Sequence, residues 1–356
     1  MLAIAQAQSY NAAMLVTFID DSLPYDGHTP TSQPLGGAEK SVVGLATSLA
    51  GRGHVVRVFN GCTFPIVAHG VSWQPLQECR TSRTDWLVVH RKPALLARIA
   101  DADRRALLLS TPAGYLLNRD ELGAVNRSKP VLVVQGIAHA FTIPVPLQSY
   151  SSVTLQLGVG ASYLTSAPMA PNAPPHAVAT THPARGLDWL LTLWCEKIQP
   201  QVPAAELHLY SAVLDKGALG AAVPDKVAPV LAQAQAAAAQ GVRILRPAAD
   251  PEMADAYRKA RVHLYPGSAR DVLCSTLAES QAVGLPAVAR PLGAADERLR
   301  NGVTGYLAPD DDAFANLAVR MLDDRETFDR LSAQARMATR GPDWARAAEE
   351  LEHALK

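Results

Sequence analysis

Short apolar segments alternate with helical segments along nearly the whole chain, on both sides of one proline-rich stretch. Ahead of that stretch, the predicted strands lie at 14–19, 55–59, 85–89, 106–110, 131–135 and 152–157. After it, they lie at 177–181, 207–211, 242–246, 262–265, 286–289 and 305–308. Alternating strands and helices are typical of parallel sheets covered by helices on both faces. The pattern therefore predicts an α/β fold with two doubly wound, Rossmann-like parallel sheets.

The proline-rich stretch marks a domain boundary. Residues 167–176 carry too many prolines for a helix or a central strand. A chain of 356 residues also exceeds one usual hydrophobic core. We therefore expect a first domain over residues 1–166, a hinge over 167–176 and a second domain over 177–340. Residues 341–356 are predicted to form a last helix with one apolar face.

The overall composition excludes several classes of function. The formal net charge is +0 and 48% of the residues are hydrophobic, so no global field attracts nucleic acid or a membrane. The 4 cysteines show neither metal-ligand spacing nor a disulfide framework. The first thirteen residues lack the basic start and long apolar run of a secretory signal. No apolar stretch reaches the roughly twenty residues that a membrane span needs. We expect a cytoplasmic protein that does not bind nucleic acid.

Charge is uneven over residues 80–130, which carry ten basic and five acidic side chains. A solvated surface is one interpretation, and weak peripheral contact with the inner face of an anionic membrane, or with an acceptor, is the other. Asp101-Ala-Asp103 lies in this stretch, in a segment expected to be helical, and Asp310-Asp-Asp312 precedes a predicted helix. Acidic residues are favoured at helix starts, so we interpret both as structural and expect no metal site.

Two carboxylates eight positions apart define the most informative motif, Asp271-Val-Leu-Cys-Ser-Thr-Leu-Ala-Glu279. The pattern predicts Asp271 in a loop and Glu279 about two turns into a helix. The free N–H groups of a first helical turn favour anions, so this turn is a candidate cradle for sugar and phosphate. The residues at its start are Leu273, Cys274, Ser275, Thr276 and Leu277. A solvated helix face with two acids is the alternative interpretation.

Two other segments carry groups suited to phosphate. Gly36-Gly37-Ala-Glu39 opens an amphipathic helix at the carboxyl edge of the first predicted sheet, where α/β folds bind ligands. Arg185 follows the strand at 177–181, and its guanidinium can make paired hydrogen bonds to phosphate. An ordinary helix start and a plain surface arginine are the alternatives.

Three side chains are candidates near the reacting groups. His139 follows the strand at 131–135, where an imidazole can bind a hydroxyl or accept a proton. A loop histidine without a catalytic role is the alternative. His90, at the end of the strand at 85–89, and Asp20 are secondary candidates for the acceptor side.

The block from Asp271 to Glu279 resembles the E-x7-E signature of family-4 retaining glycosyltransferases, with Asp at its first position. Gly293-Ala-Ala-Asp-Glu297 and Asn301-Gly-Val-Thr-Gly305 resemble the segments that follow in that family. The resemblance covers nearly the whole chain and implies the GT-B fold, in which two Rossmann-like domains face one another across a cleft. In that fold the last helix crosses back onto the first domain. The chain departs from the family at Thr180, where an arginine is usual.

The resemblance also implies an activity, the transfer of a sugar from a nucleotide-diphosphate sugar to an acceptor with retention of configuration. No metal or cofactor is implied, and the acceptor class stays open among glycans, lipid-linked molecules and small molecules. The implied catalytic residues are His139, Asp271 and Arg185. The implied donor-binding residues are Gly36, Gly37, Arg185, Leu273, Cys274, Ser275, Thr276, Leu277 and Glu279.

Alternatives with the same architecture stay open at this point. The Asp at position 271 and the Thr at position 180 are compatible with a pseudoenzyme that binds a nucleotide sugar without turnover. A sugar-nucleotide epimerase and a disaccharide phosphorylase are further alternatives.

Overall fold

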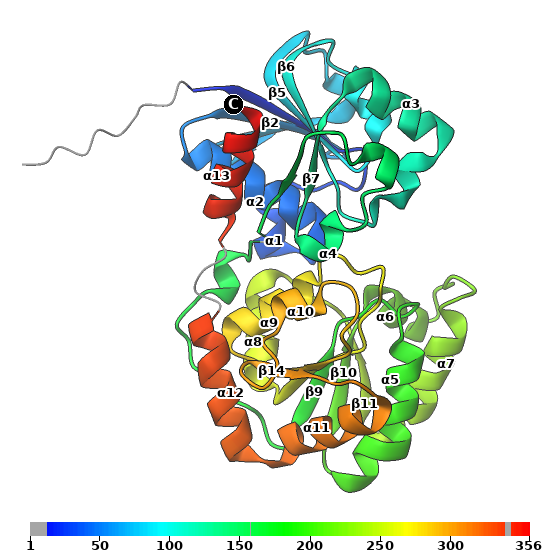
Figure 1. The fold of residues 1–356 in the computed structure, drawn as a ribbon. Helices are drawn as coiled ribbons and strands as arrows, with labels where there is room; N and C mark the ends of the chain where they lie inside the picture. The colour runs from blue at the N-terminus through cyan, green and yellow to red at the C-terminus, as the bar shows by residue number, and fades with distance from the viewer. Residues whose placement is uncertain (1–12, 157, 339–342) are drawn as a thin grey trace, which may run out of the picture.

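The computed structural model describes residues 13–156, 158–338 and 343–356. Two sheets divide them into two α/β domains, one above the other in Figure 1. The predicted fold class is thereby confirmed. Expectations that concern residues 1–12, 157 and 339–342 lie outside the described residues.

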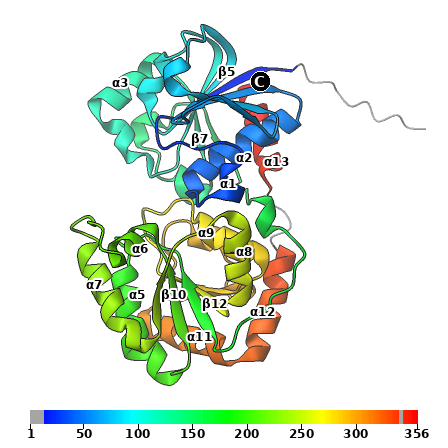
Figure 2. The ribbon, with the colours of Figure 1, turned by 180° about the vertical axis from the view of Figure 1, so that it is seen from behind.

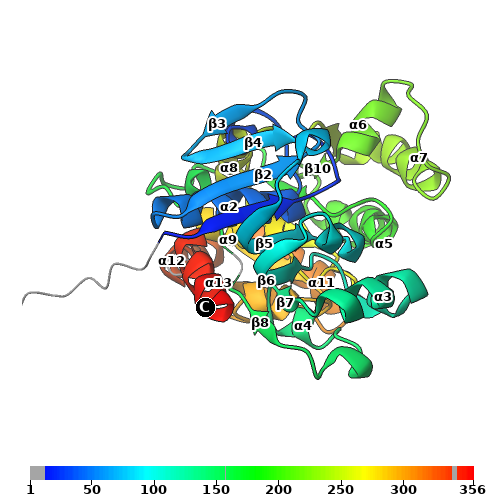
Figure 3. The same ribbon diagram turned by 90° about the horizontal axis from the view of Figure 1, so that it is seen from above.

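The first sheet has eight strands in the order β3-β4-β2-β1-β5-β6-β7-β8. Their bounds are β1 Leu15–Ile19, β2 Val55–Asn60, β3 Ile66–Ala68, β4 Val71–Pro75, β5 Arg83–His90, β6 Asp101–Leu108, β7 Val131–Val134 and β8 Ser152–Thr154. The strands lie side by side when the molecule is viewed from above in Figure 3. The sequence analysis missed β3 and β4, which form an antiparallel pair through a turn at His69 and Gly70, both at positive φ.

The second sheet has six parallel strands in the order β11-β10-β9-β12-β13-β14. Their bounds are β9 His176–Ala179, β10 Glu206–Tyr210, β11 Val242–Leu245, β12 Val262–Tyr265, β13 Ala287–Ala289 and β14 Gly305–Leu307. Each lies at one of the predicted strands.

Helices cover both sheets. Those of the first domain are α1 Thr29–Ser32, α2 Gly37–Gly51, α3 Arg119–Ser128 and α4 Ile137–Ala140. Those that follow are α5 Leu187–Leu193, α6 Ala212–Ala218, α7 Ala228–Ala236, α8 Asp250–Lys259, α9 Ser275–Val283, α10 Ala295–Arg298, α11 Asp311–Asp323, α12 Arg325–Ala338 and α13 Trp344–Leu355. Among these described helices, none has both the length and the apolar character needed to cross a membrane.

The core of the first domain consists of two layers, one on each face of its sheet. Val16 and Phe18 of β1 pack on the same side as α2, whereas Ile19 belongs to the cluster on the other side. This alternation follows from the two-residue period of side chains along a strand. The apolar runs of the sequence are therefore strands that are buried on both faces.

The last helix, α13, lies against the first domain, beside α2 (Figure 2). Its Ala347, Leu351 and Leu355 are buried in the same cluster as α2. Glu352, which is 2% exposed, fixes the helix further because it accepts hydrogen bonds from Arg52 Nε at 2.6 Å and Lys356 Nζ at 2.5 Å. The chain thus crosses between the domains a second time before it ends.

Candidate functional site

The carboxyl ends of the central strands of both sheets face the space between the domains. In the first sheet β1 lies between β2 and β5, and in the second β9 lies between β10 and β12. Strand order reverses at such points, and α/β folds bind ligands in the crevice that results. Asp20 directly follows β1, and Thr180 directly follows β9. The two switch points therefore carry Asp20 in the first domain and Thr180 in the second.

The N-termini of α2 and α9 meet across the interface. A Cβ atom added to Gly37 would lie 2.0 Å from Ser275 Oγ and 2.5 Å from Ser275 Cβ. Only glycine allows so close an approach of the two backbones. Gly36, the N-cap of α2, is exposed beside it. This places the predicted glycine turn directly on the helix of the carboxylate motif.

Asp271 holds the loop that starts α9. Its Oδ1 accepts a hydrogen bond from the backbone N–H of Cys274 at 2.9 Å, and its Oδ2 accepts one from Tyr265 OH at 2.5 Å. Cys274 lies in the left-handed region at φ 46°, and burial raises the pKa of its thiol to about 12. Asp271 is half-buried and thus combines a structural role with its place at the site.

The other residues of the turn divide into two sets. Leu273, Cys274 and Leu277 are buried, so only their backbone groups are candidates for contact with a ligand, whereas Ser275 and Thr276 are half-buried. Because α9 begins at Ser275, Glu279 lies about one turn into the helix, not two as expected.

Glu279 is buried, at 5% exposure, which argues against a solvated helix face. Its Oε1 lies 2.7 Å from Nζ of Lys40 in α2, and the same ammonium lies 2.5 Å from Oδ1 of Asp250 in α8. Tyr163 OH also donates a hydrogen bond to Asp250 at 2.9 Å. A cavity of about 540 Å³ opens onto Lys40, Asp250 and Glu279. Sequence reasoning missed Lys40, Asp250 and Tyr163, although Lys40 directly follows the glycine motif.

Arg185 and Thr180 lie on the second-domain side of the site. Arg185 is exposed in the loop after β9, which leaves its guanidinium accessible. Thr180 Oγ1 donates a hydrogen bond to Thr276 Oγ1 at 2.8 Å and lies 3.1 Å from His263 Nε2. The threonine in the place of the usual arginine thus connects β9 to α9.

Asp20 and His90 form one buried pair at the first switch point. His90 Nδ1 lies 3.1 Å from Asp20 Oδ2, and His90 Nε2 lies 2.8 Å from Ser110 Oγ. Burial alone would raise the pKa of Asp20, but hydrogen bonds from His90, Ser22 and Tyr25 lower it well below its usual range. The sequence analysis named Asp20 and His90 separately, and the structure joins them and adds Ser110, for which the sequence held no signal.

His139 does not present a free nitrogen to the site. The side chain is 0% exposed; its Nδ1 accepts a hydrogen bond from the backbone N–H of Gln135 at 3.3 Å, and its Nε2 lies 3.0 Å from Thr111 O. Burial lowers the pKa of this imidazole to about 4. The geometry favours a neutral histidine that orders the loop after β7 over the proposed proton acceptor.

A second set of contacts across the interface lies beside His139. Glu297 accepts hydrogen bonds from the backbone N–H groups of Ile137 at 3.0 Å and Ala138 at 2.5 Å. Arg298 donates to Gln135 O at 2.9 Å and to Leu273 O at 3.0 Å. The segment after the carboxylate motif thus binds the first domain directly.

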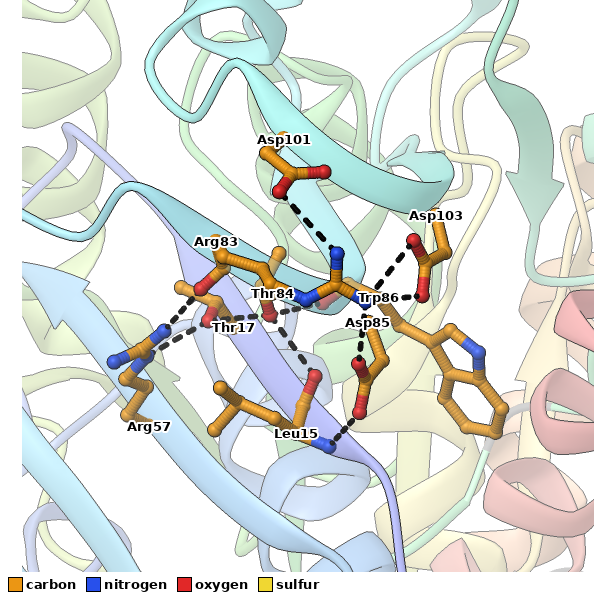
Figure 4. Close-up of polar contacts among 9 residues, drawn as sticks. All are labelled: Leu15, Thr17, Arg57, Arg83, Thr84, Asp85, Trp86, Asp101 and Asp103. Atoms are coloured by element: carbon orange, nitrogen blue, oxygen red, sulfur yellow. Dashed lines mark hydrogen bonds and ion pairs between the residues drawn. The ribbon is translucent and has the colours of Figure 1, made fainter.

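Arg83, one of the ten basic residues of the stretch 80–130, is paired with acids of the same stretch. Arg83 lies 3.2 Å from Asp101 and 3.3 Å from Asp103. Figure 4 shows the three side chains and their contacts. Both acids lie on β6, so the expected helical segment is a strand, where they face the arginine on the neighbouring β5. These residues lie at the amino ends of the strands, away from the switch points.

Metal-binding geometry does not occur among the described residues, in which no three His, Cys, Asp or Glu side chains gather as possible ligands. Asp310 caps α11 by accepting a hydrogen bond from the backbone N–H of Ala313 at 2.8 Å. This contact agrees with the interpretation of Asp310-Asp-Asp312 as a helix start rather than a metal site.

Comparison with known proteins gives a family match and one related sequence. Residues 177–324 match the model of the family described as "Glycosyl transferases group 1". D-inositol 3-phosphate glycosyltransferase 1 of Catenulispora acidiphila is 32% identical over 112 residues, which are 31% of this chain. The match covers 27% of that relative's length.

Solved structures extend the likeness to both domains. Sucrose-phosphate synthase of Thermosynechococcus elongatus has a TM-score of 0.71 at 13% identity, covering 95% of this chain and 97% of its own. Anabaena Alr3699/HepE, solved with UDP and glucose, has a TM-score of 0.71 at 15% identity, with coverages of 96% and 99%. WaaG, a glycosyltransferase of lipopolysaccharide biosynthesis, has a TM-score of 0.67 at 12% identity, with coverages of 96% and 100%. The chain therefore has the GT-B fold of glycosyltransferases, and its second domain matches glycosyl transferases group 1.

Proposed function

We propose that the protein transfers a sugar from a nucleotide-diphosphate sugar to an acceptor hydroxyl, with retention of configuration and without a metal or other cofactor. The observation that carries this proposal is the meeting of Gly37 and Ser275, which brings the N-termini of α2 and α9 to one point between the domains. Helix N-termini favour phosphate through their free N–H groups and the helix dipole.

Roles for the second-domain residues follow from their positions. Arg185 is exposed in the loop after β9, and a guanidinium there stabilises the charge that grows on the diphosphate as the glycosidic bond breaks. Glu279 faces the cavity and accepts hydrogen bonds from the ribose hydroxyls. Asp271 lies at the loop end of α9 and faces the transferred sugar. These groups stabilise the leaving diphosphate by fixed charges and dipoles.

The acceptor side is the carboxyl edge of the first sheet. Asp20, His90 and Ser110 form a hydrogen-bonded row there, and Ser110 is the most exposed of the three at 8%. We propose that this row contacts the acceptor hydroxyl through Ser110. The relatives named above act on different molecules, so the acceptor class is open to glycans, lipid-linked molecules and small molecules.

The test is a thermal-stability screen of nucleotide sugars, followed by an assay of acceptor-dependent nucleotide release. A ligand at one hundred times its Kd adds about 2.7 kcal/mol to stability. Anomeric analysis of the product tests retention, and turnover in the presence of EDTA tests metal independence. Tight donor binding without turnover would favour the pseudoenzyme instead. Epimerised donor, or phosphate-dependent release of a sugar phosphate, would favour an epimerase or a phosphorylase.

We also propose a cytoplasmic location, with weak peripheral membrane contact through residues 80–130. The ten basic side chains of that stretch support it, although Arg83 is already bound by acids. Co-sedimentation with anionic vesicles at low and high salt tests this contact, since an electrostatic attraction weakens as salt increases.

A further inference from the structure

Lys40 connects the two domains at the candidate ribose site. Its ammonium comes from α2 of the first domain and lies 2.5 Å from Asp250 Oδ1 and 2.7 Å from Glu279 Oε1, both in the second domain. The side chains are 15%, 6% and 7% exposed respectively, so water screens these charges little. Lys40 and Glu279 are 239 positions apart in the sequence, so only the tertiary structure brings them into contact.

Lys40 supplies the positive charge that offsets part of the negative charge of this cluster. Two carboxylates and one ammonium leave a single net negative charge. The groups that face Glu279 are Lys40 from α2, Asp250 and Tyr257 from α8, and Tyr163 from η5 (Ala161–Tyr163). Lys40 is the one cation among these four, and the two tyrosines are neutral near pH 7. Its removal leaves two buried carboxylates that share no positive partner in this set.

The directions of the pKa shifts agree with the role of Lys40 as the cation that faces Glu279. Burial raises the pKa of Glu279 and Asp250 raises it further; Lys40 opposes both effects and limits the rise, although the pKa stays above its usual value. Burial alone would lower the pKa of Lys40, but the attraction of Glu279 and Asp250 outweighs it and the pKa is raised. Lys40 therefore stays charged.

The two hydroxyls of a ribose can both donate hydrogen bonds to one carboxylate if it offers two acceptor oxygens. An ionised carboxylate does so, whereas in a protonated carboxyl group one oxygen carries a proton and becomes a donor. We propose that Lys40 is a positioning residue that keeps Glu279 ionised, so that its carboxylate can accept both hydroxyls of a ribose diol, and that it thereby sets the affinity of the protein for its nucleotide-sugar donor. This inference rests on the proposed function. Lys40 acts from the opposite domain, so donor affinity requires the two domains to be closed on one another.

Lys40→Met separates this role from a merely structural one through the pH profile of binding. Without the ammonium, nothing opposes the effects of burial and of Asp250 on Glu279, so the pKa of Glu279 should rise further. The Kd of the donor should then rise as pH falls from 8 to 6, by up to about ten-fold per pH unit below the raised pKa of Glu279. The wild-type Kd should change less over this range, because Lys40 limits the rise in the pKa of Glu279.

The measurement is calorimetry with UDP-glucose and GDP-mannose as probes, because a diphosphate esterified at both ends does not titrate near neutral pH. Lys197→Met is the matched control, since Lys197 is 41% exposed and pairs with Asp312. The double variant Lys40→Met/Asp250→Asn leaves one carboxylate in the cluster. It should restore affinity and flatten the pH profile, which the loss of a structural tie would not do.

The outcomes distinguish a failure of the proposed function from a failure of the role of Lys40. If the wild type binds neither probe nor any nucleotide sugar in the screen, the proposed function fails and this inference fails with it. If the wild type binds, and Lys40→Met binds equally well with the same pH profile, the role of Lys40 alone is refuted. An affinity loss in Lys40→Met that is independent of pH and persists in the double variant also refutes it. If Lys40→Met does not fold, the double variant and Lys40→Arg decide, and both are expected to bind.

Discussion

Gly37→Ala should hold the two domains apart, because the new Cβ would lie 2.5 Å from Ser275 Cβ. An ordinary contact of this kind is no shorter than 3.4 Å, so the backbones must separate by about 0.9 Å, the difference between the two values. A rotation of the serine side chain removes the clash with Oγ but not that with Cβ. Overpacking of this size costs ~1–3 kcal/mol, which corresponds to roughly a 5- to 140-fold loss of donor affinity.

Two measurements check this prediction. Calorimetry gives the donor affinity, and small-angle scattering gives the radius of gyration, which should increase as the interface opens. Gly51→Ala is the matched control at the other end of α2, because its added Cβ would meet no atom within 4 Å. Adding Ser275→Gly to Gly37→Ala removes both clashing atoms and should restore the wild-type radius of gyration. A Gly37→Ala protein with unchanged affinity and radius would show that the domains do not need this contact.

Three further changes test the site and the fold. Arg185→Ala should lower turnover by roughly ten- to a thousand-fold, because ~1.5–4 kcal/mol of charge stabilisation is lost. The melting temperature should not change, since the side chain is exposed. Unchanged turnover would remove Arg185 from the site. Glu279→Gln should weaken calorimetric binding of both the donor and the bare nucleoside diphosphate, whereas Asp271→Asn should spare the nucleotide and impair transfer. Equal losses in both variants would contradict the separate roles. Burial would raise the pKa of Glu352, yet its basic partners lower the pKa to about 2 in the folded protein. The ionised carboxylate therefore stabilises the fold above the pKa of the unfolded chain, near 4.5, and this stabilisation is lost as the pH falls towards 2. Glu352→Gln should therefore cost about 1–3 kcal/mol in denaturant unfolding at pH 7 and almost nothing near pH 2, and a cost that does not depend on pH would contradict this.

The sequence by itself determined the features that depend on local pattern. Apolar segments of strand length, separated by helical periods, predicted two doubly wound sheets, and every strand except β3 and β4 lies at a predicted segment. Gly36 and Gly37 predicted the start of α2, and the spacing of Asp271 and Glu279 predicted a loop followed by a helix. These features were readable because caps, turns and side-chain period act over a few residues. The turn at His69 and Gly70 was also local, but the sequence analysis overlooked it.

The tertiary structure alone decided how these parts meet. The pairing of Lys40 with Glu279 and Asp250, and of His90 with Asp20 and Ser110, joins residues from different strands and domains. No local period encodes such contacts, since they depend on strand order and on how the two domains pack. The same reason explains His139, whose place after β7 was predicted correctly. Its burial against Thr111, which leaves it no free nitrogen, was set by the neighbouring strand's loop rather than by its own segment.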